Sequence, residues 1–228
     1  MMKKNIISTL VIGAFLLPLH LSAASETEKR LRAAANALKD VMGTPDKAIP
    51  QDLLNKAQCV IIVPDLKKAA FLVGGKYGKG FVSCRKPGGV GWSAPGSIRI
   101  EGGSFGLQIG GSEMDVFMLV MNERGMDRLL STKFTLGGDA TVAAGPVGRS
   151  TQAETDARMT AEILTWSRAR GLFAGIALNG ATLREDEDWN EELYGKPMKN
   201  REIVFGTVAA PKSAAPLLSE LDRYSSRR

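Results

Sequence analysis

The chain has 228 residues, a formal net charge of +6 and a single histidine, His20. This length suits one domain of ordinary size with enough chain to build a core. The modest charge excludes the dense basic footprint of a nucleic-acid-binding protein, and a single histidine near the N-terminus excludes Ser-His-Asp triads, histidine bases and histidine metal sites from the rest of the chain.

The first 24 residues have the order of a secretory signal peptide. Two lysines precede an apolar run over residues 6–21, which ends in three small residues. The alternative is an uncut membrane anchor, but the run is short for a span of about 20 residues and Pro18 interrupts it. We therefore predict cleavage after Ala24 or Ala23, and an exported domain over residues 25–228 with a net charge of +4.

A helix is predicted directly after that point. Residues 31–42 carry apolar side chains at i, i+3, i+4 and i+7. Ser25 and Glu28 match a capping box, and Gly43 followed by Pro45 provides a stop. The opposite face is polar, which indicates a surface helix packed by its apolar stripe. The alternative, a helix that lies on a membrane, is weaker because the stripe has no Trp or Phe.

Pro50 can open a second short helix through Ala57, after which the pattern changes to short β-branched runs between glycine-rich turns. Further helices are predicted near 123–131 and 213–224. The predicted strands cover residues 59–63, 69–73, 80–84, 99–110, 116–121, 134–144, 161–167, 172–178 and 203–208, and the pair around the Arg-Gly corner at 170–171 forms a hairpin.

These elements predict an α+β fold with a glycine-rich antiparallel β core, sandwich or barrel-like, flanked by N-terminal helices and a C-terminal helix. Within one domain, the helical N-terminal part covers 25–57, the β-rich core 58–210 and the C-terminal helix 211–228. The glycine-rich run 74–80 is followed by strand-like residues, whereas a phosphate loop needs a helix there. We therefore expect no nucleotide or other cofactor, and assign the glycines to turns, bulges and coiled strands.

The two cysteines fall at strand ends. Cys59 opens the first predicted strand and Cys84 closes the third. If these strands pair antiparallel, a cross-strand disulfide is geometrically possible, and two separate buried thiols are the alternative. An oxidising compartment favours closure of such a pair. Two thiols alone make a poor zinc site, because structural zinc needs four ligands.

Acidic residues suggest neither a metal site nor an active site. The stretch 185–188 lacks the spaced ligands and glycine of a calcium loop, so we predict a solvated charged turn that leads into a helix. A carboxylate-based hydrolase needs two acids close together in one cleft. The candidates are scattered over the predicted sheet, and they are Glu101, Glu113, Asp115 and Asp139. We predict that the protein is not an enzyme.

Six motifs in order resemble the SYLF family of lipid-binding domains. The longest reads VPDLKKAAFLVGGKYGKG, and the resemblance runs from about residue 30 to the C-terminus. The motifs lie at residues 63–80, 91–95, 108–111 with Asp115, 133–140, 144–149 and 167–175. The resemblance implies phospholipid binding without enzymatic chemistry, and for fungal members actin binding.

Bacterial members of that family are usually exported, and many are lipoproteins, whereas this chain lacks an anchoring cysteine near its predicted cleavage point. The resemblance therefore implies a periplasmic protein, or one peripherally associated with the outer membrane. Since a periplasm normally lacks phosphoinositides, the implied ligand is an anionic phospholipid or membrane surface. The alternative is an envelope protein-interaction or scaffold module without a lipid ligand.

Cationic side chains crowd residues 66–80, which we predict to form a turn and hairpin. Each lysine near an anionic membrane contributes about 1 kcal/mol. Aromatic residues nearby, including Phe71 and Phe81, are candidates for insertion, although core packing is their commoner role. Arg149, Arg168 and Arg170 form a second cationic set that either grips a phosphate or caps strand ends. The predicted lipid-binding residues are Lys67, Lys68, Lys76, Lys79, Arg85, Lys86, Tyr77 and Trp92.

Overall fold

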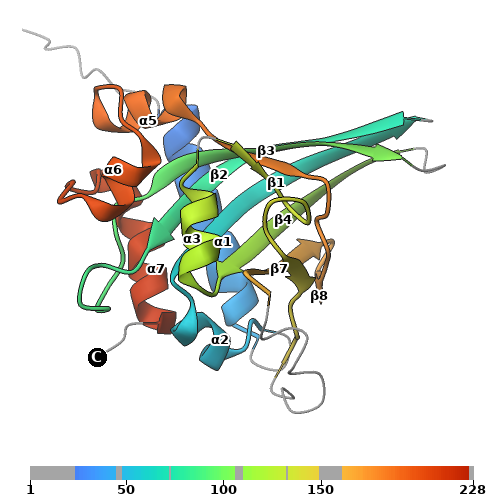
Figure 1. Ribbon diagram of the computed structural model, residues 1–228, viewed down its shortest axis with the longest axis horizontal. Coiled ribbons are helices and arrows are strands. Elements are labelled where there is room, and N and C mark those ends of the chain that lie inside the picture. The colour runs from blue at the N-terminus through green and yellow to red at the C-terminus, as the bar shows by residue number, and fades with distance from the viewer. Residues whose placement is uncertain are drawn as a thin grey trace, which may run out of the picture.

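A computed structural model describes residues 24–44, 48–71, 73–105, 110–131, 133–148 and 161–225, with the backbone alone described at 69–71, 73, 104, 105 and 110. One nine-stranded sheet lies between helices, in the order β5-β9-β3-β2-β1-β4-β7-β6, with β8 also paired to β7 (Figure 1). This arrangement confirms the predicted α+β class.

The strands are β1 (Cys59–Phe71), β2 (Val73–Cys84), β3 (Gly96–Phe105), β4 (Gly110–Val120), β5 (Lys133–Thr135), β6 (Val142–Ala144), β7 (Ile163–Ala169), β8 (Leu172–Gly175) and β9 (Thr182–Glu185). All the described pairs are antiparallel except β6 with β7. The helices are α1 (Glu26–Met42), α2 (Gln51–Lys56), α3 (Glu123–Leu129), α5 (Glu187–Tyr194), α6 (Asn200–Phe205), the 3-10 turn η2 (Lys212–Ala214) and α7 (Ala215–Ser225).

Helix α1 begins and packs as its sequence predicts. The Glu28 N–H donates to Ser25 Oγ at 3.2 Å, and the Ser25 N–H donates to Glu28 Oε2 at 3.3 Å, which completes the capping box. Gly43 follows as the C-cap. The apolar stripe is buried and the polar side is exposed, so the surface-helix interpretation is confirmed.

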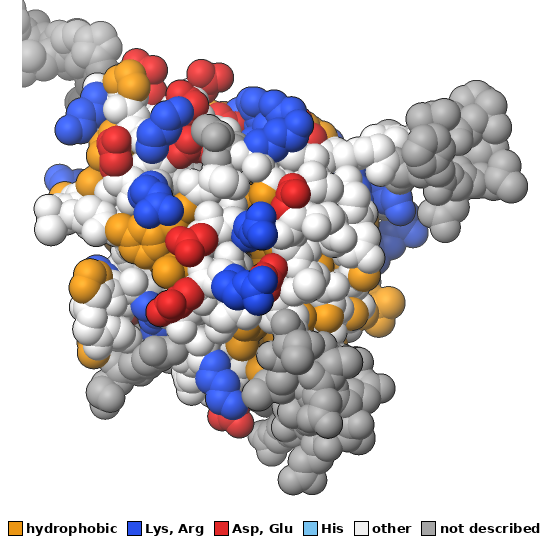
Figure 2. All heavy atoms as spheres, viewed as in Figure 1, with side chains coloured by type: hydrophobic (Ala, Val, Ile, Leu, Met, Phe, Trp, Pro, Cys, Tyr) orange, Lys and Arg blue, Asp and Glu red, His pale blue; other side chains and the backbone are white. Residues whose placement is uncertain are grey.

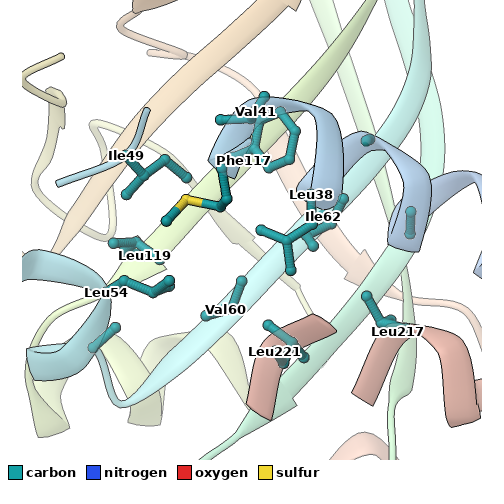
Figure 3. Close-up of a cluster of buried hydrophobic side chains, with 14 of the residues drawn as sticks. Leu38, Val41, Ile49, Leu54, Val60, Ile62, Phe117, Leu119, Leu217 and Leu221 are labelled. Carbon is teal, nitrogen blue, oxygen red and sulfur yellow. The ribbon is translucent and has the colours of Figure 1, made fainter. Parts of the chain in front are cut away.

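The two faces of the sheet pack against different helices. The α1 face, which carries Val60 and Ile62 of β1, packs on α1, α2 and α7 (Figure 3). The α3 face carries Ile61 and Val63, and packs on α3, α6 and the segment around β5. Because side chains alternate along a strand, the parity of each residue number decides which face it joins, until a bulge interrupts the alternation.

Such a bulge lies in the middle of β1, at Pro64 and Asp65. The register with β2 and with β4 shifts there, so that Val63 and Leu66 are both buried on the α3 face. Asp65 has φ of 50°, and its N–H donates to Asp115 Oδ1 at 3.1 Å. Arg30 of α1 donates to the Pro64 carbonyl at 3.0 Å. The bulge is thus held by β4 and by α1.

This bulge corrects the prediction of two strands over 59–63 and 69–73, because the chain bends at Pro64 without turning back. The reversal comes between β1 and β2, where Phe71 pairs with Val73. The hairpin predicted over 66–80 is therefore present, and its lysines lie on the two strands.

Other elements differ from or match the prediction. The run 203–208 is not a strand, because Ile203 and Val204 are buried on the short helix α6. The run 134–144 splits into β5 and β6 around a turn with Gly137 at φ of 80°. Strand β9 was not predicted at all. The β7–β8 hairpin, α3 and α7 are confirmed. The stretch 185–188 leads into α5 as predicted, but the prediction of a solvated turn is wrong, because Glu185 ends β9 and Asp186 is buried as the N-cap of α5.

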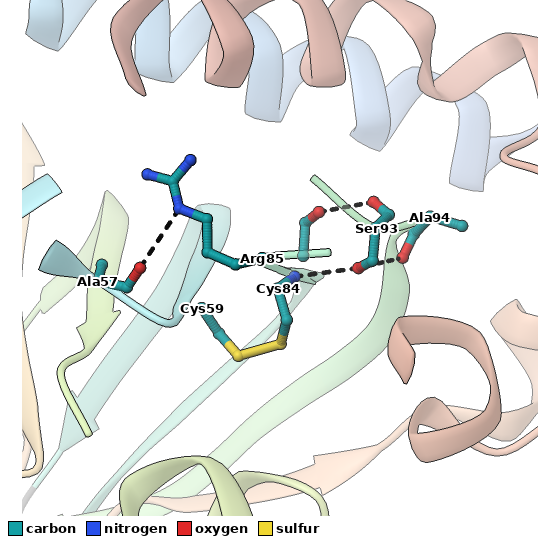
Figure 4. Close-up of a disulfide and its surroundings, with 7 residues drawn as sticks. Ala57, Cys59, Cys84, Arg85, Ser93 and Ala94 are labelled. Carbon is teal, nitrogen blue, oxygen red and sulfur yellow. Dashed lines mark hydrogen bonds between the residues drawn. A yellow bond between two sulfur atoms is a disulfide. The ribbon is translucent and has the colours of Figure 1, made fainter. Parts of the chain in front are cut away.

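Cys59 and Cys84 are Cα partners in the β1–β2 register and form a disulfide (Figure 4). Both are fully buried, and the Cys84 N–H donates to Ser93 Oγ at 3.0 Å. Of the two alternatives left open by the sequence, the structure contains the disulfide.

Candidate functional site

Four central strands extend past the rest of the sheet. Strand β9 pairs with β3 over residues 98–101, and β7 pairs with β4 over residues 115–120. Beyond those positions β3 and β4 remain paired with β2 and β1, but within the described part of the chain no strand pairs with their outer edges. We call this projecting end, at the right of Figure 1, the ribbon, and it comprises residues 66–71, 73–77, 102–105 and 110–114.

One lysine and one tyrosine of the ribbon lie on the α1 face. Lys67 pairs across the strands with Tyr77 on β2 and with Glu113 on β4. Its Nζ lies 3.7 Å from Glu113 Oε1, and both side chains are exposed. An exposed pair of this kind contributes little to stability, so Lys67 remains available to a ligand. Tyr77 is 48% exposed, unusual for so large an apolar side chain in this protein.

Two more lysines of the ribbon lie on the α3 face. Lys68 follows the buried Leu66 by two residues and is the direct cross-strand partner of Lys76. Burial and then the nearby positive charge of Lys68 lower the pKa of Lys76. Two ammonium groups placed side by side favour an anion between them, because the anion relieves their repulsion.

Lys79 lies outside the ribbon, and its charge is already paired with an acidic side chain. Its Nζ lies 2.8 Å from Oδ2 of the buried Asp186 and 4.4 Å from the centre of the Trp189 ring. Phe81 stacks on the same Trp189 and is buried. These contacts hold α5 against β2, so Lys79 has a structural role.

Arg85 and Trp92 are at the opposite end of β2, about 30 Å from Lys76 by the rise of a strand. Arg85 is 7% exposed and Trp92 2% exposed, and the guanidinium lies 3.8 Å from the Trp92 ring centre. Lys86 is exposed in the following loop. Of the eight predicted lipid-binding residues, the structure thus brings together Lys67, Lys68, Lys76 and Tyr77 on the ribbon and places the other four elsewhere.

The second cationic set is also divided. Arg168 Nε and Nη2 donate to Asp115 Oδ2 at 2.9 and 2.7 Å, and its Nη1 donates to Asp40 Oδ2 at 2.7 Å. Arg168 thus ties α1 to β4, as a strand-end role predicts. Arg170 is exposed in the β7–β8 turn. Arg149, like the side chain of Phe71, lies outside what the structure describes.

The four acids considered for catalysis have separate partners. Glu101 pairs with Arg99 at 3.0 Å, whereas Asp139 accepts the Thr135 N–H at 2.7 Å. An open pocket of about 220 Å³ beside Asp115 mixes acids with Arg168 and Arg170. Within the described ranges there is no metal-binding group of three His, Cys, Asp or Glu side chains, and no helix suited to cross a membrane.

The strand register that shapes the site could not be predicted from the sequence. The predicted hairpin has a register that places Lys68 opposite Lys76 and Lys67 opposite Tyr77. The prediction of a hairpin over 66–80 did not specify which residues pair. The role of Glu113 as partner of Lys67 was also missed, because it depends on strand β4 lying beside β1.

Comparison with known proteins identifies relatives. The Ysc84 family model, described as "Las17-binding protein actin regulator", matches residues 101–224. SH3 domain-containing YSC84-like protein 1 of Xenopus laevis is 36% identical over 210 residues, which cover 89% of this chain and 62% of that protein. The Homo sapiens protein of the same name is 35% identical over 184 residues, covering 80% of this chain and 53% of that protein.

A yeast protein matches over a similar part of the chain. LAS seventeen-binding protein 3 of Saccharomyces cerevisiae (strain ATCC 204508 / S288c) is 33% identical over 211 residues, covering 90% of this chain and 45% of that protein. This chain thus spans about half the length of the relatives it matches. The family description and the name of the yeast protein both specify binding to Las17, which supports a binding role. The chain belongs to the Ysc84 family, whose domain is the SYLF domain.

Proposed function

We propose that this protein binds the surface of anionic phospholipid membranes through the ribbon. The observation that carries the proposal is the gathering of Lys67, Lys68, Lys76 and the exposed Tyr77 at the free end of the sheet. Glu113 is the only acidic residue in the ribbon sequence, so this end carries a net positive charge. In Figure 2, basic side chains lie against the base of the same projecting end.

The placement of the lysines favours an end-on approach. Lys67 lies on the α1 face and Lys68 on the α3 face, so a membrane that met one face flat would contact only part of the set. An end-on ribbon brings lysines of both faces to the headgroups, with Tyr77 at the interface. Three lysines at about 1 kcal/mol each give weak, reversible attraction that salt screens.

The first test uses charge reversal. We expect the full chain to co-sediment with phosphatidylglycerol-containing vesicles, and the variant K67E/K68E/K76E to lose about 100-fold in affinity, since about 3 kcal/mol of attraction disappears. Binding should also fall as salt rises from low to physiological concentration. The measurement is vesicle co-sedimentation against lipid concentration, with phosphatidylcholine vesicles in parallel.

The matched control is K196E/K212E, which makes two equivalent charge changes at exposed lysines in the α5–α6 connection and η2, on the other side of the molecule from the ribbon (Figure 1). We expect it to bind nearly as well as the unchanged protein. Equal losses in both variants, or equal binding to neutral vesicles, would refute ribbon-mediated binding.

We place this activity in the bacterial cell envelope as part of the same proposal. The Cys59–Cys84 disulfide supports an oxidising compartment. Expressed in its own cells, the protein should appear in the periplasmic or membrane-associated fraction with the intact mass of residues 25–228 and one disulfide. Full-length protein with two free thiols in the cytoplasm would contradict this location.

A second candidate is recognition of a protein partner without lipid. It is favoured by the family description and by the name of the yeast relative, both of which specify binding to Las17. A partner captured stoichiometrically by the purified chain, together with no binding to any vesicle, would favour this candidate over the first.

A further inference from the structure

Lys76 has surroundings unlike those of the exposed lysines. It is half-buried, and its stem crosses Gly102 of the neighbouring strand β3. A Cβ at Gly102 would lie 2.8 Å from Lys76 Cε, 3.2 Å from Ala181 Cα and 3.3 Å from the Gly180 carbonyl oxygen. The methylene chain of Lys76 therefore lies in space that a side chain at residue 102 would fill, and the backbone of residues 180 and 181 borders the same space. Access to the amine is thus narrowed but not closed.

The surroundings of Lys76 increase the fraction of its amine that is neutral. Lys68 of β1 is the charged group that bears on it, and burial acts in the same direction, so its pKa is lowered. Glu113 and Glu101 lie on the opposite face of the sheet, where they pair with Lys67 and with Arg99. A lysine whose pKa is lowered has a larger neutral fraction at neutral pH, and the neutral amine is the nucleophile.

We propose that Lys76 is an acylation site for small acyl phosphates, and that Lys68 is the positioning residue that attracts their phosphate. The neutral Nζ of Lys76 attacks the acyl carbon, an N–C bond forms and the C–O bond to phosphate breaks. Phosphate leaves with the electron pair of that bond, and the extra proton on nitrogen passes to water. The product is an amide, and no oxidant or reductant is needed.

This inference does not depend on membrane binding, although acylation removes one of the three ribbon charges. Acylation is therefore a route by which the site would lose affinity for an anionic surface. A failure of vesicle binding would leave the reactivity of Lys76 standing, and unreactive Lys76 would leave vesicle binding standing.

The test measures acylation rates residue by residue. The full chain is treated with acetyl phosphate at pH 7.5 to low conversion, and each lysine is quantified by peptide mass spectrometry. We expect Lys76 to react several-fold faster than Lys196 and Lys212, because its lowered pKa enlarges the fraction of neutral amine and Lys68 attracts the phosphate. A rate for Lys76 no higher than for those two lysines would overturn the proposal.

The matched variants are Lys68→Met and Lys67→Met, which remove adjacent charges on opposite faces of the ribbon. Lys68→Met should slow acetylation of Lys76 several-fold, because the pKa of Lys76 rises and the phosphate loses its partner. Lys67→Met should leave it nearly unchanged. Equal effects of the two variants would exclude a specific role for Lys68.

Acetic anhydride serves as an uncharged second probe. With it, Lys68→Met should slow Lys76 less than with acetyl phosphate, because only the change in pKa remains. An identical slowing with both probes would overturn the assignment of phosphate attraction to Lys68.

Discussion

Gly80→Ala is expected to lower the free energy of unfolding by about 3 kcal/mol, at the upper end of the cost of overpacking. Gly80 lies on β2 opposite the bulge of β1. A Cβ there would lie 2.1 Å from the Ile62 carbonyl oxygen and 2.7 Å from Val63 Cα. Both atoms are backbone in the centre of the sheet, so relief requires the two strands to separate. Thermal and urea unfolding measure the loss, which corresponds to about 6–12 °C in a chain of this size.

The control for this substitution is Gly103→Ala on β3. Gly103 has no heavy atom within 4 Å of its Cβ position and is not among the glycines with positive φ. Alanine there reduces the freedom of the unfolded chain, and we expect a change of less than about 1 kcal/mol, in the stabilising direction. Equal destabilisation by both substitutions would show that close approach at the bulge is not the cause.

Arg85→Met is the second large effect, and we expect it to cost about 3 kcal/mol because it removes the hydrogen bonds that a buried guanidinium donates to three segments of the chain. Arg85 Nη2 donates to the Leu54 carbonyl at 3.2 Å, and the same guanidinium donates to the backbone carbonyl and hydroxyl of Ser225. Its Nε reaches the Ala57 carbonyl, as Figure 4 shows. One side chain thus joins β2, α2 and the end of α7.

The expected signature of Arg85→Met is local as well as global. In this variant helix α7 should exchange its amide hydrogens faster than in the unchanged protein, because it loses its anchor at Ser225. The increase should be larger in α7 than in the central strands. Arg32→Met, on the exposed side of α1, is the matched control and should change stability by less than about 0.5 kcal/mol. Unchanged protection of α7 in the Arg85 variant would contradict the anchoring role.

The local signals in the sequence predicted the elements that depend on neighbouring residues. The capping box at Ser25 and Glu28 and the stop at Gly43 define α1 within a few residues. The Arg-Gly corner predicted the β7–β8 hairpin, where Arg170 and Gly171 have φ of 49° and 79°. These features are determined by backbone preferences within one turn, and tertiary contacts agree with them.

Elements that depend on distant contacts were not predicted. The run at Ile203 and Val204 has the composition of a strand, but burial on a short helix overrides that preference. Strand β9 is only four residues long and exists because β3 and β5 flank it. No pattern within such a short segment distinguishes it from a loop.

The candidate site could be predicted in part, for the same reason. Lys67, Lys68, Lys76 and Tyr77 are close in the sequence and meet on paired strands. Arg85 is also close in the sequence, but the length of β2 carries it to the other end of the sheet, where α7 covers it. Closeness along the chain does not determine closeness in space once a strand is as long as β2.

The extra residue at Pro64 and Asp65 decides which amine shares the environment of Lys76. In an uninterrupted strand Lys67 would follow Val63 onto the α3 face and lie opposite Lys76, and Lys68 would lie on the α1 face that carries Tyr77. With the bulge these assignments are exchanged. One inserted residue therefore determines which of two adjacent lysines lies opposite Lys76. A deletion there would give that position to Lys67 in place of Lys68 without changing either side chain.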